Sequence, residues 1–371
     1  MMEEELLAMM ALSEVPGIGL MTARSLLAVM EKATDVFKKR ESLHRHLPGL
    51  PGRVIEALAS PEPMRRAEKE LRFVQDHAIQ CLPFYSEGYP SRLRECDDAP
   101  ILLYYRGKAD LNAVRVVSVV GTRHMTPYGQ QMCEEFLRDL KALVPDVLVV
   151  SGLAYGVDAQ AHRSAMANGF STVGVLAHGL DRIYPSAHQR MARTMLEQGG
   201  LLTEYKTETR PDRQNFVARN RIVAGMADAT VVVESAQKGG SLITASLADS
   251  YHKECFAFPG RAVDEFSQGC NNLIFSGKAA LIQSAEDFVK AMHWDAASCM
   301  QKPWAVQRQL FVDLSPEEQR VVDLLKERGD LQINTLVVEA NIPVNKMSVL
   351  LFEMEIKGVL RALAGGMYHL L

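Results

Sequence analysis

The stretch VVSVVGTR, residues 116–123, decides the fold of this chain. Its first five residues are apolar except for Ser118, as expected of a strand that is buried on both faces of a parallel sheet. Gly121 then turns the chain, and residues 127–143 follow with the periodicity of an amphipathic helix. A buried strand, a glycine turn and a helix in this order predict the first unit of an α/β domain.

The same alternation continues to about residue 293. Further strands are predicted at residues 147–150, 172–177, 201–202, 230–233 and 255–258. Helices are predicted between them, at residues 158–168, 187–198, 216–226 and 241–252. Such alternation indicates a Rossmann-like α/β fold, in which a doubly wound, mostly parallel sheet has right-handed crossovers. Residues 101–105 are expected to add a strand or hairpin at the sheet edge.

Short helices are predicted before this domain. The segment VPGIG at residues 15–19, followed by the helical residues 22–27, has the form of a helix-hairpin-helix element. Its glycine turn leaves the first amides of the next helix exposed, and in DNA-binding proteins such amides hold a phosphate. The alternative is a small helical domain with glycine turns that binds nothing.

A winged-helix domain is predicted at the other end. Ser315 and Pro316 give a clear helix start, two more helices follow, and two short strands flank Gly365 and Gly366. Winged-helix domains commonly read DNA with their third helix. Here that helix carries two lysines against two glutamates, so contact with DNA and contact with protein both remain open. The predicted division is residues 1–62 (helical, helix-hairpin-helix or SAM-like), 78–294 (Rossmann-like), 295–312 (linker) and 313–371 (winged helix).

Composition restricts the function. A chain of 371 residues suits two or three domains. Its net charge is −4 and its pI about 6.2, whereas nucleic-acid-binding proteins usually carry a basic excess. If the chain binds nucleic acid, its positive charge must be concentrated locally.

Cysteine usage and hydropathy exclude several other classes. The six cysteines contain no CxxC pair, which argues against a zinc site and a disulfide framework and fits a reducing cytoplasm. No apolar stretch is long enough to span a bilayer, and the acidic N-terminus does not suit a signal peptide. We therefore expect a cytoplasmic protein with no metal, no cofactor and no membrane partner.

Glycine-containing loops follow four of the predicted strands. They comprise residues 120–124, 151–158, 177–181 and 234–244. Because the carboxyl ends of parallel strands share one sheet edge, these loops are expected to meet there. Glycine permits a close approach of phosphate oxygens to backbone N–H groups, so the loops predict binding of a phosphate or nucleotide. The alternative is that the glycines only make tight turns between strand and helix, which would account for any one of these loops taken alone.

The motifs of several enzyme classes are missing. The chain has no G-x-x-x-x-G-K-[ST], no G-x-G-x-x-G after the first strand, no G-x-S-x-G and no H-E-x-x-H. Asp158 and His162 are spaced to face each other across one helical turn. Such a pair is more often a structural contact than a catalytic dyad, so we expect binding without catalysis.

The strongest cationic signal is the segment RPDRQNFVARNRIV at residues 210–223. Its cationic residues are Arg210, Arg213, Arg219 and Arg221. Arginine binds phosphate in a bidentate manner, and an exposed Phe216 would offer a base a stacking surface. With Arg123 and Lys238 on nearby loops, this segment predicts a local positive site. In the alternative interpretation, the ring of Phe216 lies in the core and the arginines pair with Glu204, Glu208 or Asp228. For Arg219 and Arg221 we expect at least one such internal pair.

These residues resemble the DNA-processing protein A (DprA/Smf) family. Its pattern appears here in order over about residues 85–291, as Gly121-Thr122-Arg123, the segment from Ser151 to His162, Asn220 to Gly225, and Gly240 to Ala245. The resemblance implies a homodimer, joined through the Rossmann-like domain, that binds single-stranded DNA, protects incoming DNA during natural transformation and helps to load the RecA recombinase.

The resemblance also implies site residues. Arg123, Arg213, Phe216 and Lys238 would form the pocket, although the family usually has a small residue at the position of Lys238. The amides of Gly121, Ser151 and Gly240 would hold phosphate, and Arg219 and Asn220 would contact or support the site. The full predicted DNA-binding set is Gly121, Thr122, Arg123, Ser151, Gly152, Arg213, Phe216, Arg219, Asn220, Lys238, Gly240 and Ser241.

Two other functions stay open. A nucleotide-processing enzyme on a lysine-decarboxylase-like Rossmann scaffold also uses glycine-rich loops, but it carries a Pro-Gly-Gly-x-Gly-Thr-x-x-Glu motif. The nearest segment here, residues 238–244, lacks the following glutamate. A winged-helix regulator with a ligand-sensing domain would need a more basic third helix.

Overall fold

The computed structural model describes residues 2–294, 314–363 and 365–371. Its contacts divide the chain into two compact units, Met1–Ala285 and Glu286–Leu371, and each is described by itself. The predicted linker at residues 295–312 lies outside the described residues. The four-part domain division stays a prediction.

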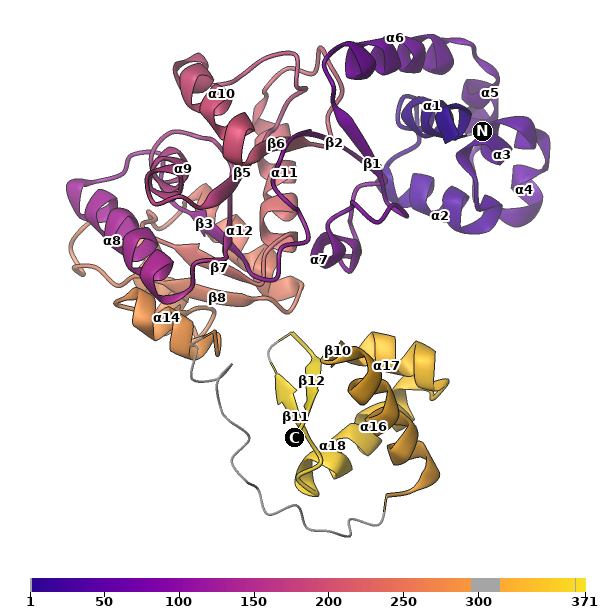
Figure 1. The fold of residues 1–371 in the computed structure, drawn as a ribbon. Coiled ribbons are helices and arrows are strands. Elements are labelled where there is room, and N and C mark those ends of the chain that lie inside the picture. The colour runs from indigo at the N-terminus through magenta and orange to yellow at the C-terminus, as the bar shows by residue number, and fades with distance from the viewer. Residues whose placement is uncertain (1, 295–313, 364) are drawn as a thin grey trace. The chain divides into compact units, whose positions relative to one another are not determined.

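Short helices form the N-terminal part of the first unit (Figure 1). They are α1 (Met2–Leu12), α2 (Leu20–Met30), α3 (Ala33–Lys38), the 3-10 turn η1 (Arg40–Ser42), α4 (Leu43–His46), α5 (Gly52–Ala59) and α6 (Glu62–Asp76). The predicted glycine turn joins α1 to α2. Apolar side chains of these helices share one core with Leu102 and Tyr104 of the sheet, so the helical part and the sheet pack as one body.

A nine-stranded sheet occupies the rest of this unit. Its strands are β1 (Gln80–Pro83), β2 (Leu102–Gly107), β3 (Val116–Val120), β4 (Leu148–Ser151), β5 (Ser171–Val175), β6 (Gly200–Thr203), β7 (Ala229–Val232), β8 (Glu254–Ala257) and β9 (Ala280–Leu281). Their order is β1-β2-β6-β5-β4-β3-β7-β8-β9. The strands from β3 to β9 pair in parallel, whereas β1 and β2 add an antiparallel edge. The mostly parallel Rossmann-like sheet is therefore confirmed.

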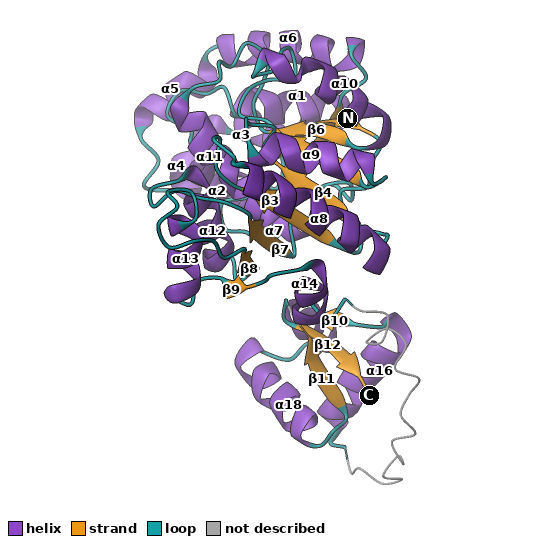
Figure 2. Cartoon of the chain, turned by 90° about the vertical axis from the view of Figure 1, so that its left-hand side faces the viewer, coloured by secondary structure: helices purple, strands orange, loops and turns teal. Residues whose placement is uncertain are grey.

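Helices cover both faces of the sheet. They are α7 (Ser91–Arg94), α8 (Pro127–Leu143), α9 (Val157–Ala167), the 3-10 turn η2 (Ser186–His188), α10 (Gln189–Gln198), α11 (Arg213–Gly225), α12 (Gly240–Ser250) and α13 (Gln268–Phe275); α14 (Ala285–Ala291) follows at the unit boundary. α8 packs against α9, and α11 packs against α12. Figures 1 and 2 show these two pairs on opposite faces. β3 is consequently buried along its whole length, as its apolar run predicted.

The second unit contains the winged helix. Its elements are α16 (Pro316–Arg328), β10 (Leu331–Gln332), α17 (Ile333–Ala340), α18 (Val344–Ile356), β11 (Leu360–Leu363) and β12 (Met367–Leu370). The side chain of Ser315 caps α16 in a capping box with Glu318, at the predicted helix start. The two-residue strand β10, which pairs with β12, is too short to show in the sequence pattern.

No single helix of the described residues is long and apolar enough to cross a bilayer. By length and composition, α17 and α18 would suffice only together, and the two are bent by 111° relative to each other.

Candidate nucleic-acid interface

The predicted glycine loops lie together at the carboxyl edge of the sheet. β3, β4, β5 and β7 run parallel, so the loops that follow them leave on the same side. The chain passes from β3 through α8 to β4, which pairs with one side of β3, whereas β7 pairs with the other side of β3. Loop amides and helix N-termini converge at such a switch point, where open α/β sheets bind ligands.

Arg123 contacts Phe216 at this edge, and Arg213 precedes that ring by about one turn on the same helix. The guanidinium carbon Cζ of Arg123 lies 5.0 Å from the centroid of the Phe216 ring, a cation–π distance. Arg213 begins α11, and Phe216 follows it by three residues, so both lie on one helix face. Both arginines are exposed, and within the described ranges neither forms an ion pair. One exposed cation therefore lies against a partly exposed aromatic ring, and a second begins the helix that carries this ring.

The loop that carries Arg123 is fastened by its own backbone. The N–H of Thr122 donates to the carbonyl of Glu234 (2.7 Å), and the carbonyl of Thr122 accepts from the N–H of Val157 (3.1 Å). A Cβ on Gly121 would lie 2.5 Å from Cγ2 of Val157. The Thr122 amide is thus engaged inside the protein and positions the arginine, while the Gly121 amide stays a predicted phosphate donor.

Gly156, in the neighbouring loop, packs closely against the backbone of Thr122 and Arg123. Its φ is +75°, and a Cβ there would lie 2.2 Å from the carbonyl oxygen of Thr122 and 2.8 Å from Cα of Arg123. We expect Gly156→Ala to weaken DNA binding and to lower the midpoint of thermal unfolding, because the backbone under Arg123 must move. Gly169→Ala is the matched control, since its φ is +71° and its Cβ would meet open space. Thermal unfolding and DNA titration of both variants measure the difference. Equal losses in the two variants would contradict the clash, because a positive φ alone costs about 1 kcal/mol.

Ser151, Gly152 and Arg219 form a support beneath the loops. The hydroxyl of Ser151 donates to the carbonyl of Val119 (2.6 Å). Arg219 is only 3% exposed, and its Nη1 donates to the carbonyl of Val175 (2.6 Å). A Cβ on Gly152 would lie 2.0 Å from that Nη1, so this glycine makes room for the arginine. Burial lowers the pKa of Arg219. In this arrangement Arg219 supports the loop from inside and does not reach the surface.

The pair Asp158 and His162 is not joined by a hydrogen bond. Nδ1 of His162 donates to the hydroxyl of Thr172 (2.7 Å), which itself donates to the carbonyl of Val149. Burial lowers the pKa of His162 to about 3, so the ring is neutral. Burial also raises the pKa of Asp158, although the charge of Arg219 opposes that rise. This arrangement matches a buried polar contact and gives no acid–base dyad.

The fourth loop divides into exposed and buried residues. Lys238 and Gly240 are exposed, and Gly240 begins α12. Nδ2 of Asn220 lies 3.4 Å from the carbonyl oxygen of Gly240, so it links α11 to the start of α12. Ser241 is 5% exposed, and its hydroxyl donates to Ser235 (2.8 Å). Lys238 and the Gly240 amide can therefore reach a ligand, whereas Ser241 and Asn220 hold the loop. No cluster of three or more potential metal-ligand side chains occurs in the part of the chain that the structure describes.

The remaining arginines of the cationic segment also divide into an exposed one and one that is paired inside the protein. Arg210 is exposed. Arg221 forms an ion pair with Glu204, and its Nη1 donates to the carbonyl of Asp98 (2.6 Å). The expected internal pairing of Arg221 is confirmed. Only Arg210 and Arg213 of this segment therefore add positive charge to the surface.

Two tyrosines in the segments that follow β4 and β5 also lie at this edge, and the sequence pattern did not predict them. The ring of Tyr184 lies 5.7 Å from that of Phe216, centroid to centroid. Tyr155, in the second loop, makes an edge-on contact with the ring of His188, with the ring centroids 5.1 Å apart. Their only sequence signal is an aromatic residue in a loop that follows a predicted strand.

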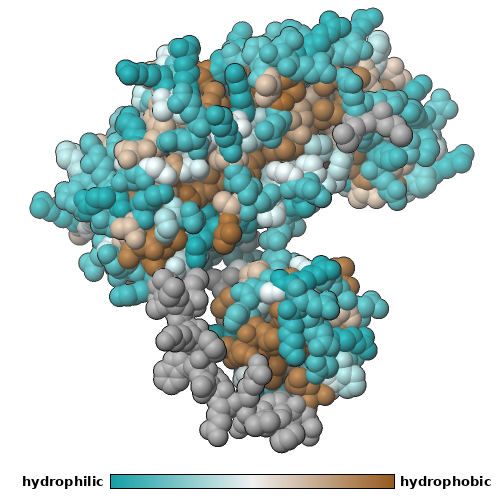
Figure 3. Space-filling view, viewed as in Figure 1, coloured by the Kyte–Doolittle hydropathy of each residue, from teal (hydrophilic) through white to brown (hydrophobic). Residues whose placement is uncertain are grey.

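The third helix of the winged-helix unit lacks a free basic face. Lys346 pairs with Glu317 and Lys357 with Glu318. The exposed side of α18 instead carries apolar side chains, namely Val349, Phe352 and Ile356. Figure 3 shows hydrophobic side chains on the visible face of this unit. These features favour contact with protein over contact with DNA at this helix.

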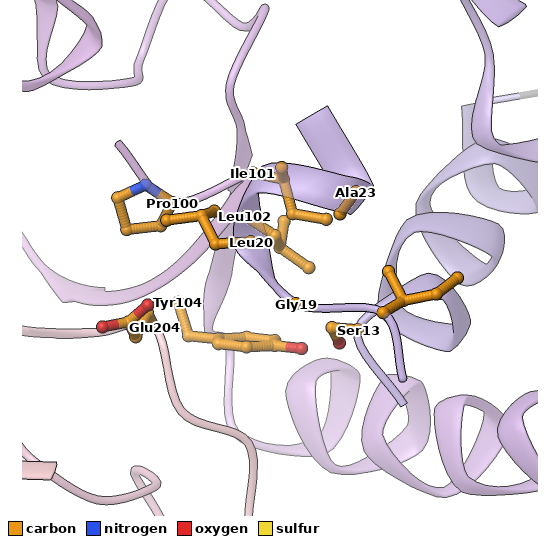
Figure 4. A pocket seen from close by; sticks show the side chains of 10 residues that line it. Ser13, Gly19, Leu20, Ala23, Pro100, Ile101, Leu102, Tyr104 and Glu204 are labelled. Carbon is orange, nitrogen blue, oxygen red and sulfur yellow. The ribbon is translucent and has the colours of Figure 1, made fainter. Parts of the chain in front are cut away.

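A cavity of about 150 Å³ lies between α2 and β2 (Figure 4). Gly19 and Leu20 at the start of α2 line it, together with Tyr104 and Glu204. The lining includes the carboxylate of Glu204 and no cationic side chain. The glycine turn therefore does not offer a phosphate site inside this cavity.

Comparison with known families identifies the same regions. Residues 80–293 match the model of the family described as DNA recombination-mediator protein A, and residues 309–366 match that of the DprA winged helix domain. The DNA processing protein DprA of Streptococcus pneumoniae is 39% identical over 212 residues, which cover 56% of this chain and 74% of that protein. Protein Smf of Escherichia coli is 32% identical over 319 residues, covering 83% and 82%.

Solved structures of DprA proteins are similar to this one. DprA from S. pneumoniae superposes with a TM-score of 0.57 at 30% identity, covering 74% of this chain and 98% of that one. DprA from Helicobacter pylori, described for its mode of binding single-stranded DNA, has a TM-score of 0.52 at 30% identity, covering 58% and 96%.

Proposed function

The chain belongs to the DNA recombination-mediator protein A (DprA/Smf) family of DNA-processing proteins, and on this premise we propose that it binds single-stranded DNA at the carboxyl edge of its sheet. The observation that carries the proposal is the contact of Arg123 with Phe216 there, on a helix that begins with the exposed Arg213. The relative from H. pylori, which binds single-stranded DNA, supports it.

The chemistry of this cluster suits an unpaired strand. Guanidinium groups bind phosphate oxygens without regard to sequence, and a phenyl ring stacks on any base whose face is open. Bases in a duplex keep their faces covered by their neighbours. A cluster of this kind therefore gains more from a single strand than from a duplex, and it does so in a protein whose net charge is −4.

We propose that the protein acts by binding and not by catalysis. The loops hold no hydrogen-bonded acid–base pair between Asp158 and His162, because His162 bonds to Thr172 instead. A nucleotide-processing enzyme on a lysine-decarboxylase-like scaffold remains the alternative. Release of base or phosphate from nucleotides by the purified protein would support that alternative.

The proposal is tested by titrating the purified protein with single- and double-stranded oligonucleotides of one sequence over a salt series. We expect tighter binding of the single strand and a steep loss of affinity with salt, as phosphate contacts require. Equal affinity for both forms, or binding that salt does not change, would overturn the proposal.

Beyond binding, we propose the roles that the family resemblance implies. The protein protects incoming DNA during natural transformation, helps to load a RecA-type recombinase, and acts in the cytoplasm. The cysteines within the described ranges are all free thiols, which suits a reducing compartment.

We further propose a homodimer joined through the Rossmann-like domain. Phe275, at the end of α13, is 93% exposed, and Leu281 of the edge strand β9 is 48% exposed. We expect Phe275→Asp to dissociate the dimer, because a charge at the centre of an apolar contact loses its hydration. Light scattering at several concentrations measures the mass. The control is Val114→Asp, at another exposed apolar residue (82%). A Phe275→Asp variant that stays dimeric would contradict a dimer contact at Phe275. An unaltered protein that is monomeric at every concentration would contradict the dimer itself.

A further inference from the structure

We propose that Tyr184 is a second base-contacting residue and that it receives the base next to the one on Phe216. The inference rests on the proposed binding of single-stranded DNA. It extends the site from the first and fourth loops to the segment that follows β5.

The backbone of Tyr184 is held at the sheet edge. Its N–H donates to Nε2 of His178 (3.2 Å), and Nδ1 of His178 donates to the carbonyl of Gly179 (2.9 Å). His178 is 1% exposed and burial lowers its pKa, so the neutral ring can accept this hydrogen bond. The hydroxyl of Thr203 donates to the carbonyl of His178 (2.9 Å). The turn before Tyr184 is therefore anchored to β6.

The side chain of Tyr184, by contrast, faces outward. It is 45% exposed, whereas the following Pro185 is buried. Its hydroxyl makes no hydrogen bond within the described ranges. A fixed backbone with an exposed ring is the arrangement that a stacking residue needs, because little conformational entropy is lost when a base covers the ring.

The angle between the two rings decides how many bases they take. The ring planes of Tyr184 and Phe216 are inclined by 54°, so one flat base cannot stack on both. Each ring can receive its own base if the strand bends between them. Arg123 lies against Phe216 and is placed to meet the phosphate backbone of that bend. The site therefore takes two successive unpaired nucleotides.

The test compares a thymine oligonucleotide with an oligonucleotide of equal length that lacks bases. Fluorescence anisotropy measures both affinities for the full-length protein. Because stacking contributes a factor of about ten per base, Tyr184→Ala should bind the thymine strand about tenfold more weakly and the abasic strand as the unaltered protein does. Tyr184→Phe keeps the ring and should stay within about twofold.

The matched control is Tyr85→Ala, which removes a tyrosine that is 61% exposed in the turn after β1. It should leave both affinities unchanged. Thermal unfolding verifies that all variants are folded. If Tyr184→Ala binds thymine normally, or loses both substrates equally, the second stacking position is wrong while the proposed function stands. If the unaltered protein binds neither strand, the proposed function fails and this inference fails with it.

Discussion

Arg213→Ala is expected to weaken the binding of single-stranded DNA roughly tenfold to a hundredfold, by the same factor for every sequence. A charge-assisted hydrogen bond is worth about 1.5–3 kcal/mol, and Arg213 has no acidic partner in the described ranges that would compete for it. The slope of log affinity against log salt should also fall by about 0.7 for each phosphate that the variant no longer neutralises. Arg123→Ala should behave in the same way. Titrations at several salt concentrations give both quantities.

Two controls separate this effect from a general loss of charge. Arg138→Ala removes an equal charge from α8, where Arg138 is exposed and pairs with Asp139, and it should change neither affinity nor slope. Phe216→Ala should lower the affinity but leave the slope unaltered, because stacking releases no counterions. Unchanged affinity in both Arg123→Ala and Arg213→Ala, with a normal circular dichroism spectrum, would remove the cluster from the mechanism.

Arg221→Leu is expected to cause the largest loss of stability, about 3 kcal/mol. Arg221 and Glu204 form an ion pair in which both side chains are mostly buried (12% and 17% exposed), and Oε1 of Glu204 has no hydrogen-bond partner. Removing the arginine leaves a buried carboxylate without compensation. Urea unfolding of the variant and of the unaltered protein measures the difference in free energy of unfolding.

The loss should depend on pH in a defined direction. Burial raises the pKa of Glu204 above its ordinary value of 4.5, and the positive charge of Arg221 opposes that rise. Without Arg221 the folded-state pKa rises further. A group with a raised folded-state pKa favours the folded state below its unfolded pKa, and this contribution is lost as the pH rises through the folded pKa. The free energy of unfolding of the variant should therefore fall furthest below that of the unaltered protein at neutral pH. The two values should approach each other near pH 4.5.

A double variant tests the cause. Glu204→Gln combined with Arg221→Leu removes both charges, so most of the lost stability should return at neutral pH. A double variant as unstable as Arg221→Leu alone would show that the hydrogen bond from Arg221 to the carbonyl of Asp98, and not the unpaired carboxylate, accounts for the loss.

Local sequence determined the elements and their order. The apolar run of β3 and the periodicity of α8 reflect interactions between neighbours along the chain, and the helix was predicted with the same ends that the structure has. The carboxyl edge followed as well, because parallel strands with right-handed crossovers place their following loops on one side. The very short strands β9 and β10 could not be predicted, since two residues carry no period.

The roles of the individual arginines depended on tertiary structure. Arg213 and Arg219 lie on the same helix, and their charges and near surroundings in the sequence are alike. Arg219 points inward because Gly152 leaves room for its guanidinium and Val175 supplies an acceptor. Both of these residues come from segments that are distant in the sequence. Tyr184 likewise reaches Phe216 only because the loop after β5 and the start of α11 lie at one edge. Sequence thus determined which chemistry the chain carries, and tertiary structure decided which groups face solvent, because burial is a property of contacts between segments that no single segment contains.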